Sequence, residues 1–295
     1  MPDSSAPVLP VRPDWLLVDG SSLIFRAFFG VPQTVVAPDG RPSNAVRGFL
    51  DYLARFITDR RPVHLAVATD EDWRPAFRVQ ALPTYKAHRT AEPVPPALEP
   101  QMEIIMQVLG AFGIPAVGAP GYEAEDVIAS LVQFAQGPVE ILSGDRDLFA
   151  LVRDPDVVVL YPQSRGEVLV VDEAEIERKY GIPGRSYADF AILRGDPSDG
   201  LPGLPNVGEK KAAALIQRHG SIAGVLRDGN LTEEDIDYIQ RAIKVVLPVA
   251  TIPLERPDGR LRADSGDANR IAELKQKYGL GGAVDRLLRA IGAVA

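Results

Sequence analysis

The stretch WLLVDGSS, residues 15–22, carries the clearest structural signal in the chain. Its first five residues form an apolar run that ends on an acid, Asp19, and Gly-Ser-Ser follows in the manner of a helix start. We expect a buried strand over 15–19 that leads directly into a helix. Asp19 would then lie at the carboxyl end of its strand, the edge where open parallel sheets bind ligands.

Outward from this stretch, strand patterns alternate with helical periodicity. Further strands are expected over residues 63–69, 139–143, 157–161 and 168–171. Helices are expected between them over residues 43–60, 97–113 and 123–135. This alternation predicts an α/β fold with a mainly parallel central sheet covered by helices. Asp70 and Asp145 follow two of the strands, so both are expected at the same edge as Asp19.

Beyond about residue 176 the strand signal fades. Helical patterns then cover residues 188–194, 209–219, 233–246, 269–278 and 284–291. We therefore expect three parts along the chain: a flexible N-terminal tail over 1–14, an α/β core over 15–175 and a helical subdomain over 176–295.

Composition limits the chemistry. The chain has 295 residues, of which 46% are hydrophobic and 24% charged, as in a globular protein with a substantial core. It has no cysteine and three histidines, which excludes disulfides, zinc ribbons and thiol nucleophiles and leaves oxygen ligands for any metal. No apolar run reaches the roughly 18 residues of a membrane span. The first fourteen residues lack the charge order of a secretion signal, so we expect an intracellular, cytoplasmic protein.

Acidic residues recur in three tight groups besides the strand ends. The groups are Glu123, Glu125 and Asp126 in YEAED, Asp145 and Asp147 in SGDRDLF, and Asp196 and Asp199 in GDPSDG. Each group alone also suits a helix cap or a turn. Together with Asp19 and Asp70, they would repel one another in one cleft unless cations neutralised them. Carboxylate oxygens select Mg2+ or Mn2+, and two such ions about 4 Å apart form the usual clamp for in-line displacement at phosphorus.

A basic segment follows Asp70. Residues 73–91 contain no acid, and their cations are interleaved with rings: Arg74, Arg78, Lys86 and Arg89, with Phe77, Tyr85 and His88. Cations suit phosphates and flat rings suit unstacked bases, so the segment predicts a nucleic-acid ligand. A solvated helix face is the alternative reading. A third class of function, a small-molecule phosphohydrolase, would have little use for such a segment.

The segment GLPNVGEK, residues 203–210, approaches a phosphate-binding P-loop. Glu209 occupies the lysine position and no Ser or Thr follows Lys210, so we reject nucleotide hydrolysis. What remains is a hairpin at a helix start, where free amides with Lys210 and Lys211 could hold one phosphate. Two helices joined by such a hairpin commonly hold duplex DNA, whereas a merely structural turn is the alternative.

Five motifs, in order over roughly residues 16–215, resemble the bacterial 5′-nuclease superfamily. They are LVDGSSLIFRAFF, FRVQALPTYKAHR, YEAEDVI, SGDRDLFALV and GDPSDGLPGLPNVGEKKAAALI. The chain is similar to the 5′ to 3′ exonuclease and flap endonuclease domain of DNA polymerase I and to its free-standing relatives. The resemblance implies a PIN-like 5′-nuclease fold, with a helical arch at about residues 73–96 and a helix–hairpin–helix element at about 203–211 in a DNA-binding helical subdomain.

The same resemblance implies the site residues. It places two or three Mg2+ or Mn2+ ions on the carboxylates Asp19, Asp70, Glu123, Glu125, Asp126, Asp145, Asp147, Asp196 and Asp199. Lys86 and Arg89 match the basic pair that contacts the scissile phosphate. The implied DNA contacts are Arg78, Tyr85, Val207, Gly208, Lys210 and Lys211, with a K+ ion at the hairpin. Asn206 replaces the first glycine of the usual hairpin and adopts positive φ less freely.

The implied activity is two-metal hydrolysis of phosphodiesters at 5′ flaps and at the 5′ ends of nicked or gapped duplexes, RNA-primed DNA included, in replication and repair. Products would carry 5′-phosphate and 3′-hydroxyl ends, and the protein would act as a monomer at the nucleoid. A catalytically silent module that binds branched DNA is the rival interpretation. The formal net charge of -8 does not exclude DNA, because the nine carboxylates more than account for it.

Overall fold

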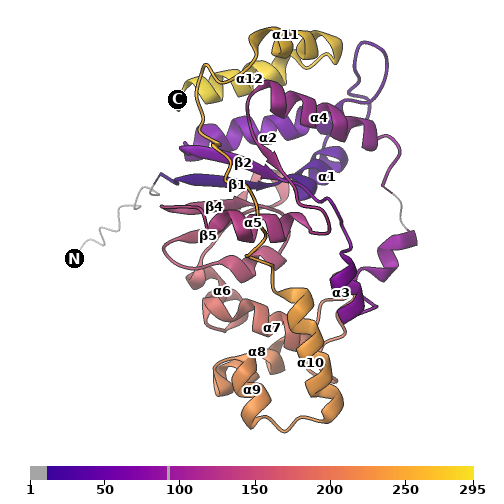
Figure 1. Ribbon diagram of the computed structural model, residues 1–295, viewed down its shortest axis with the longest axis vertical. Coiled ribbons are helices and arrows are strands. Elements are labelled where there is room, and N and C mark those ends of the chain that lie inside the picture. The colour runs from indigo at the N-terminus through magenta and orange to yellow at the C-terminus, as the bar shows by residue number, and fades with distance from the viewer. Residues whose placement is uncertain (1–11, 92–93) are drawn as a thin grey trace, which may run out of the picture.

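A six-stranded sheet with the order β3-β2-β1-β4-β5-β6 runs through the middle of the protein (Figure 1). The computed structural model describes residues 12–91 and 94–295. The strands are β1 (Trp15–Asp19), β2 (His64–Ala68), β3 (Ala116–Val117), β4 (Val139–Leu142), β5 (Val157–Pro162) and β6 (Val168–Val171). The first five are parallel and β6 is antiparallel to β5, which confirms the predicted α/β class. The two-residue β3 was not predicted, because so short a strand carries no periodicity.

The strand order reverses at β1, which lies between β2 and β4. Val18 pairs with Val67 on one neighbour and with Leu142 on the other, so the three strands end close to level. Asp19 closes β1, and the chain reaches Asp70 and Asp145 directly after β2 and β4. Ligands of open α/β sheets bind at such a reversal. The topology therefore brings three of the predicted aspartates to one edge of the sheet.

Helices cover both faces of the sheet, because side chains alternate along each strand. Leu16 of β1 faces a layer formed by α1 (Gly20–Gly30), α2 (Asn44–Arg60), α4 (Glu99–Ala111), α11 (Ala268–Lys277) and α12 (Gly281–Gly292). Leu17 faces the opposite layer, which contains α5 (Ala124–Val132), α6 (Glu173–Tyr180) and α7 (Tyr187–Arg194). The second core continues away from the sheet through α8 (Glu209–His219), α9 (Ile222–Asp228) and α10 (Glu233–Val246) (Figure 1).

The C-terminal helices correct the predicted subdomain. We expected residues 176–295 to form one helical unit, but α11 packs on α4 and α12 packs on α2, beside the sheet. The chain returns to this layer after α10 (Figure 1). The sequence predicted both helices but not their location, because an amphipathic pattern does not name the surface that it covers. The helical subdomain therefore comprises α7 to α10.

Residues 12–14 do not belong to a flexible tail. We expected a flexible tail over 1–14, of which residues 1–11 lie outside the described part of the chain. Arg12 Nε donates to the carbonyl of Arg61 at 2.5 Å, and Pro13 is buried. His64 N donates to the carbonyl of Asp14 at 2.8 Å. Residues 12–14 thus belong to the α/β core.

The described part of the basic segment packs against the helical subdomain. It contains α3 (Ala76–Ala81), which packs against α10, and a 3-10 helix (Ala87–Ala91). Lys86 N donates to the carbonyl of Asp199 at 2.9 Å. Residues 76–89 therefore contact the rest of the protein through α3 and Lys86, and the helical arch that the family resemblance implied at about residues 73–96 stays a prediction. Among the helices that the structure describes, none combines the length and apolarity needed to cross a membrane.

Candidate active site

Hydroxyl groups hold the carboxyl ends of β1 and β4 together. Asp19 caps α1 by accepting from Ser22 N at 3.0 Å, and its second oxygen accepts from the Ser143 hydroxyl at 2.6 Å. Ser143 Oγ also accepts from Asp145 N at 2.9 Å, so the two loops are joined. Burial raises the pKa of Asp19 to about 7, and the charges of Asp70 and Asp145 act in the same direction. Ser143 was not predicted as a site residue, although its place between a strand and an aspartate was a usable signal.

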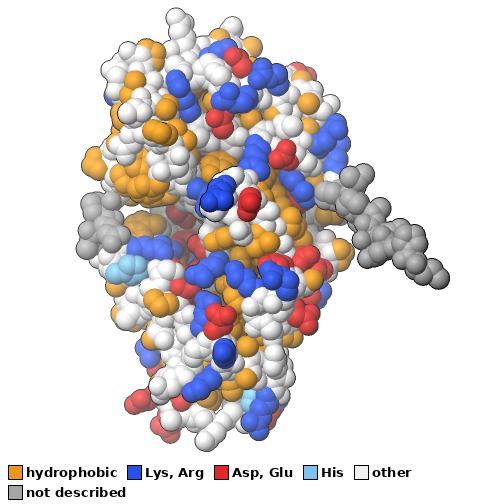
Figure 2. Space-filling model, turned by 180° about the vertical axis from the view of Figure 1, so that it is seen from behind, with side chains coloured by type: hydrophobic (Ala, Val, Ile, Leu, Met, Phe, Trp, Pro, Cys, Tyr) orange, Lys and Arg blue, Asp and Glu red, His pale blue; other side chains and the backbone are white. Residues whose placement is uncertain are grey.

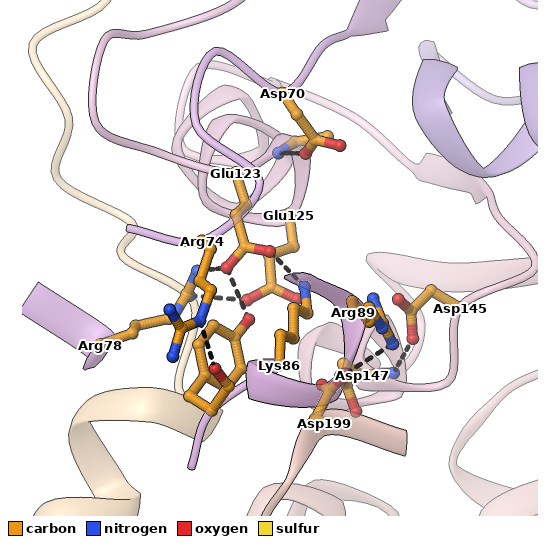
Figure 3. Close-up of polar contacts among 12 residues, drawn as sticks. Asp70, Arg74, Arg78, Lys86, Arg89, Glu123, Glu125, Asp145, Asp147 and Asp199 are labelled. Atoms are coloured by element: carbon orange, nitrogen blue, oxygen red, sulfur yellow. Dashed lines mark hydrogen bonds and ion pairs between the residues drawn. The ribbon is translucent and has the colours of Figure 1, made fainter. Parts of the chain in front are cut away.

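Asp145, Asp147 and Asp199 lie together and form the aspartate group (Figure 3). Asp145 Oδ1 accepts from Asp147 N at 3.0 Å, and a hydrogen bond links the Asp147 and Asp199 carboxyls. Burial raises the pKa of both Asp145 and Asp147, and the charge of Asp145 raises the pKa of Asp147 further. Burial also acts upward on Asp199, but the hydrogen bond from Asp147 and the charges of Lys86 and Arg89 outweigh it and lower the pKa of Asp199.

Glu123 and Glu125 form the glutamate group at the start of α5, where Glu123 is the N-cap residue. Lys86 Nζ and the Tyr85 hydroxyl both donate to Glu123, the hydroxyl at 2.6 Å. Arg78 pairs with Glu123 and, at 2.6 Å, with Glu125 (Figure 3). Burial raises the pKa of both glutamates, against the lowering effect of Arg78 and Lys86. Both groups thus concentrate acidic side chains at the carboxyl edge of the sheet.

Arg78 and Tyr85 are placed differently from the prediction. The family resemblance implied that both contact DNA, but Arg78 is 0% exposed and Tyr85 is 2% exposed. Both side chains point at the carboxylates of α5. As the side chains stand, neither reaches a ligand outside the protein. The sequence showed a basic and aromatic composition, but it did not show which of these side chains would be buried.

Asp126 has no oxygen left for a metal in this arrangement. It is 0% exposed, and its two oxygens accept from Arg78 Nη1 at 3.0 Å, Arg78 Nη2 at 2.7 Å, Val249 N at 2.8 Å and Glu123 N at 3.2 Å. An ionised carboxylate offers about four acceptor positions, and all are used. Asp126 therefore serves the capping box of α5, which was the structural alternative for an acid at a helix start.

Asp196 also has a structural role, that of a turn former. It caps the 196–199 turn by accepting from Ser198 N at 2.9 Å, and it pairs with Arg194 at 3.2 Å. Asp70 stays at the sheet edge, where its Oδ1 accepts from Ala124 N at 2.7 Å. Of the nine predicted carboxylates, the structure gathers these seven about the sheet edge: Asp19, Asp70, Glu123, Glu125, Asp145, Asp147 and Asp199.

This donor set fits a hard divalent cation. Its donors are all carboxylate oxygens: Asp19, Glu123 and Asp199 are buried, Glu125 and Asp147 are half-buried, and Asp70 and Asp145 are exposed. Desolvation and mutual repulsion raise the pKa of several of these carboxyls. Within residues 12–91 and 94–295, the acids and histidines as they stand form no group of three or more in metal-holding geometry. In this arrangement Arg78 pairs with Glu125, Lys86 with Glu123 and Arg89 with Asp199. Negatively charged oxygen ligands that need a counter-ion are the ligands that Mg2+ and Mn2+ prefer.

The turn that carries Asp199 holds the basic segment in place through hydrogen bonds. Arg89 Nη2 donates to Asp199 Oδ1 and to the carbonyl of Ser198, both at 2.9 Å. Gly200 lets the loop approach, because a Cβ at this position would lie 2.1 Å from the carbonyl oxygen of Thr84. Gly200 also has a φ of +72°. Lys86 and Arg89 therefore sit between the glutamate and aspartate groups, as Figure 3 shows.

The predicted helix–hairpin–helix element is present, with α7 and α8 joined by residues 195–208. Gly203 closes the hairpin, since a Cβ there would lie 2.4 Å from the Arg194 carbonyl oxygen. Asn206 has a φ of 58°, so it takes the left-handed conformation of the glycine that it replaces. Gly208 is the N-cap of α8 without a side-chain cap. The residues predicted to meet DNA are exposed at Gly208, Lys210 and Lys211, and half-buried at Val207.

Lys and Arg side chains gather near the site on the surface. Figure 2 shows a band of them across the middle of this face, with acidic side chains among them. Arg89 is 41% exposed and Arg146, between two residues of the aspartate group, is 42% exposed. The negative net charge is thus compatible with a locally basic surface.

Comparison with known proteins identifies the family of the chain. A family model described as "5'-3' exonuclease, N-terminal resolvase-like domain" matches residues 14–181, and one described as "5'-3' exonuclease, C-terminal SAM fold" matches residues 182–251. The chain belongs to the 5′-3′ exonuclease family. This confirms the predicted enzyme class and the resemblance that the motifs carried.

The exonuclease has relatives of similar length. It is 46% identical to a 5'-3' exonuclease of Streptomyces coelicolor, over 94% of this chain and 100% of the relative. It is 42% identical to a 5'-3' exonuclease of Mycobacterium tuberculosis, over 95% of this chain and 98% of the relative. It is also 39% identical to DNA polymerase I of Mycobacterium bovis, over 89% of this chain but 30% of the polymerase.

Solved structures share the fold of the exonuclease. The T5 D15 protein co-crystallised with metal ions superposes with a TM-score of 0.59 at 15% identity, over 95% of this chain and 99% of that one. The catalytic core of Rad2 in complex with a DNA substrate gives 0.54 at 16% identity, over 95% and 93%. These matches confirm the predicted 5′-nuclease fold.

Proposed function

We propose that this exonuclease is a structure-specific 5′ nuclease that hydrolyses phosphodiesters at 5′ flaps and at the 5′ ends of nicked or gapped duplex DNA. Its cofactors are two Mg2+ or Mn2+ ions. The observation that carries the proposal is the meeting of two carboxylate groups with Lys86 and Arg89 at the carboxyl edge of the sheet. Structural relatives have been solved with metal ions and with a DNA substrate, which supports the same chemistry.

The residues divide the work between the cations and the phosphate. When bound, the two divalent ions would lower the pKa of a water molecule toward neutrality and stabilise the leaving oxygen. The aspartate and glutamate groups would hold these ions, and Asp19 and Asp70 complete the set. Lys86 and Arg89 turn to the scissile phosphate and offset the charge that grows there. No side chain needs to act as the nucleophile.

The hairpin holds the duplex. The exposed amides at the start of α8, with Lys210 and Lys211, suit a backbone phosphate of the duplex, and a K+ ion would sit beside them. The terminal nucleotides must unstack to bring the scissile phosphate to the cations, which costs a few kcal/mol for a paired end and little for a flap. This difference selects flaps without reading bases, and it extends to RNA-primed ends. We propose that the protein acts as a monomer.

The test is a product map on a 5′-labelled double-flap substrate, first with Mg2+ and then with Mn2+. Asp145→Asn and Lys86→Ala should each lower cleavage by orders of magnitude while flap binding survives. Near-native rates in both variants would refute the site. Flap binding by the unmodified protein without product in either metal would favour the branched-DNA-binding module.

A further inference from the structure

Arg78 uses its whole guanidinium group inside the protein. An arginine has five N–H donors. Nε donates to the carbonyl of Val245 at 3.1 Å, Nη1 donates to Glu123 and to Asp126 at 3.0 Å, and Nη2 donates to Asp126 at 2.7 Å. Nη2 also forms an ion pair with Glu125 at 2.6 Å. Four of the five donors thus have a hydrogen-bond acceptor, and the side chain is 0% exposed. A residue bound in this way acts on a reaction only through the groups that it holds.

These acceptors belong to two different parts of the protein. Glu123, Glu125 and Asp126 open α5, next to the sheet edge, whereas Val245 lies in the last turn of α10. The carbonyls of a last helical turn have no partner within the helix, so Arg78 supplies one. The bond therefore joins the glutamate group to the end of the helical subdomain.

Further bonds strengthen the same connection. Val249 N donates to Asp126 at 2.8 Å. Ser130 Oγ donates to the carbonyl of Val249 at 3.0 Å and accepts from Ile252 N at 3.2 Å. Within the helical subdomain, Tyr238 of α10 donates to the carbonyl of Ile192 of α7 at 3.0 Å. A chain of short contacts thus runs from the glutamate group through α10 to the helices that bear the hairpin.

We propose that Arg78 is a positioning residue that sets the distance between the hairpin and the two carboxylate groups, and thereby the nucleotide at which the strand is cut. The inference rests on the proposed function, in which the hairpin holds the duplex and the carboxylates hold the cations. The strand is gripped at one place and cut at another. A shift of the helical subdomain along the duplex would then move the cut.

The experiment compares the unmodified protein with Arg78→Lys on a 5′-labelled flap, in Mn2+ and under single-turnover conditions, with products mapped at nucleotide resolution. Lysine keeps the charge but loses the planar fork that joins both parts. We expect cleavage at the main position to fall on the order of 10²-fold, the usual cost of a misplacement of about 1 Å. Products longer and shorter by a nucleotide should appear, with KM and duplex affinity unchanged.

Two further variants keep the result interpretable. Arg60→Lys breaks another arginine–carboxylate pair, between half-buried Arg60 and buried Glu140 and far from the hairpin contacts, and should leave the cut position unchanged. Ser130→Ala removes the neighbouring bonds to Val249 and Ile252 with a smaller change of structure. It should also give products that are longer and shorter by a nucleotide. It serves as the test if Arg78→Lys does not fold.

The outcomes are separable. A protein that cuts at one dominant position, together with an Arg78→Lys variant whose products spread, supports the inference. An Arg78→Lys variant that folds and cuts at the same nucleotide overturns it, whatever its rate, as does an unchanged cut in Ser130→Ala if that variant has to be used. An unmodified protein that cuts no flap in either metal refutes the proposed function instead. Mn2+ binding by electron paramagnetic resonance gives a readout independent of cleavage, and we expect weaker binding in Arg78→Lys.

Discussion

The ammonium group of Lys86 donates to Oε1 of Glu123, so the cation that we place on the scissile phosphate rests on a carboxylate that we place on a divalent ion. Lys86 is 8% exposed and Glu123 is 3% exposed. The two cations compete for one oxygen. Binding of a divalent ion at Glu123 would therefore release the ammonium group at the moment when a phosphate can use it.

Replacing Lys86 by methionine separates these two roles. Lys86→Met should bind Mn2+ more tightly, because the competing ammonium group is gone and a chain of similar length remains. Its flap cleavage should fall roughly 10² to 10³-fold, the usual loss for one electrostatic donor at a transition state. Calorimetric Mn2+ titration and single-turnover cleavage measure both effects. Weaker Mn2+ binding would contradict the competition, and Lys277→Met, on α11, is the control.

Divalent cations should stabilise the fold. The aspartate group crowds carboxyls whose pKa is raised by desolvation and by one another's charge, so neutralising them favours the folded state. At a concentration about 100 times the Kd, binding adds about 2.7 kcal/mol to the free energy of unfolding. Thermal unfolding in Mg2+, against an equal ionic strength of K+, should show a higher Tm. The increase should shrink in Asp147→Asn, and an equal increase in that variant would place the ion elsewhere.

Gly200 allows the basic segment to lie close to the turn that carries Asp199. An alanine Cβ would lie 2.1 Å from the Thr84 carbonyl oxygen, and the φ of +72° disfavours a side chain as well. Gly200→Ala should lower both cleavage and the free energy of unfolding, by about 1 kcal/mol or more. Gly110→Ala, in α4 with open space around it, should be neutral or stabilising. Native cleavage by Gly200→Ala would show that the loop does not need this close approach.

The hairpin lysines should affect binding and not chemistry. The double variant Lys210→Ala, Lys211→Ala removes two exposed charges beside the free amides of α8. Duplex affinity should fall, and its dependence on salt should weaken by up to about one unit of slope for each phosphate that the variant no longer binds. Cleavage at saturating enzyme should remain near native. Binding isotherms at several salt concentrations test this, and an unchanged slope would remove these lysines from the interface.

The last helix should be needed for the stability of the α/β core. Leu287 of α12 is 0% exposed and belongs to the core formed with α1, α2 and α4. Leu287→Ala should lower the free energy of unfolding by about 2 to 5 kcal/mol. Urea unfolding followed by circular dichroism measures it, with the exposed neighbour Leu288→Ala as control. An unchanged midpoint of urea unfolding would show that α12 is not needed for the stability of the α/β core.

Some periodic elements were predictable to the residue. The strand at 15–19 and the helices at 209–219 and 233–246 have the expected bounds, whereas the helices expected over 43–60, 97–113 and 123–135 run over 44–60, 99–111 and 124–132. The edge where Asp19, Asp70 and Asp145 meet followed from the alternation of strands and helices. These features depend on short segments or on general rules of α/β topology.

The direction of charged side chains was not predictable. Arg78 was expected to contact DNA and Asp126 to bind a metal, yet they bind each other at the junction of α3, α5 and α10. That junction joins segments more than a hundred residues apart, as the bond from Arg78 to Val245 shows. No local pattern contains such a meeting. The location of α11 and α12 escaped prediction for the same reason.

The path of the chain also affects the order in which the protein can fold during its synthesis. Of the described helices, α12 is synthesised last, yet it covers α2, which is synthesised near the beginning. A nascent chain that already contains the site carboxylates and the hairpin still lacks the α12 side chains of the core formed with α1, α2 and α4. The α1, α2 and α4 layer can therefore close its hydrophobic core only after α12 has been synthesised.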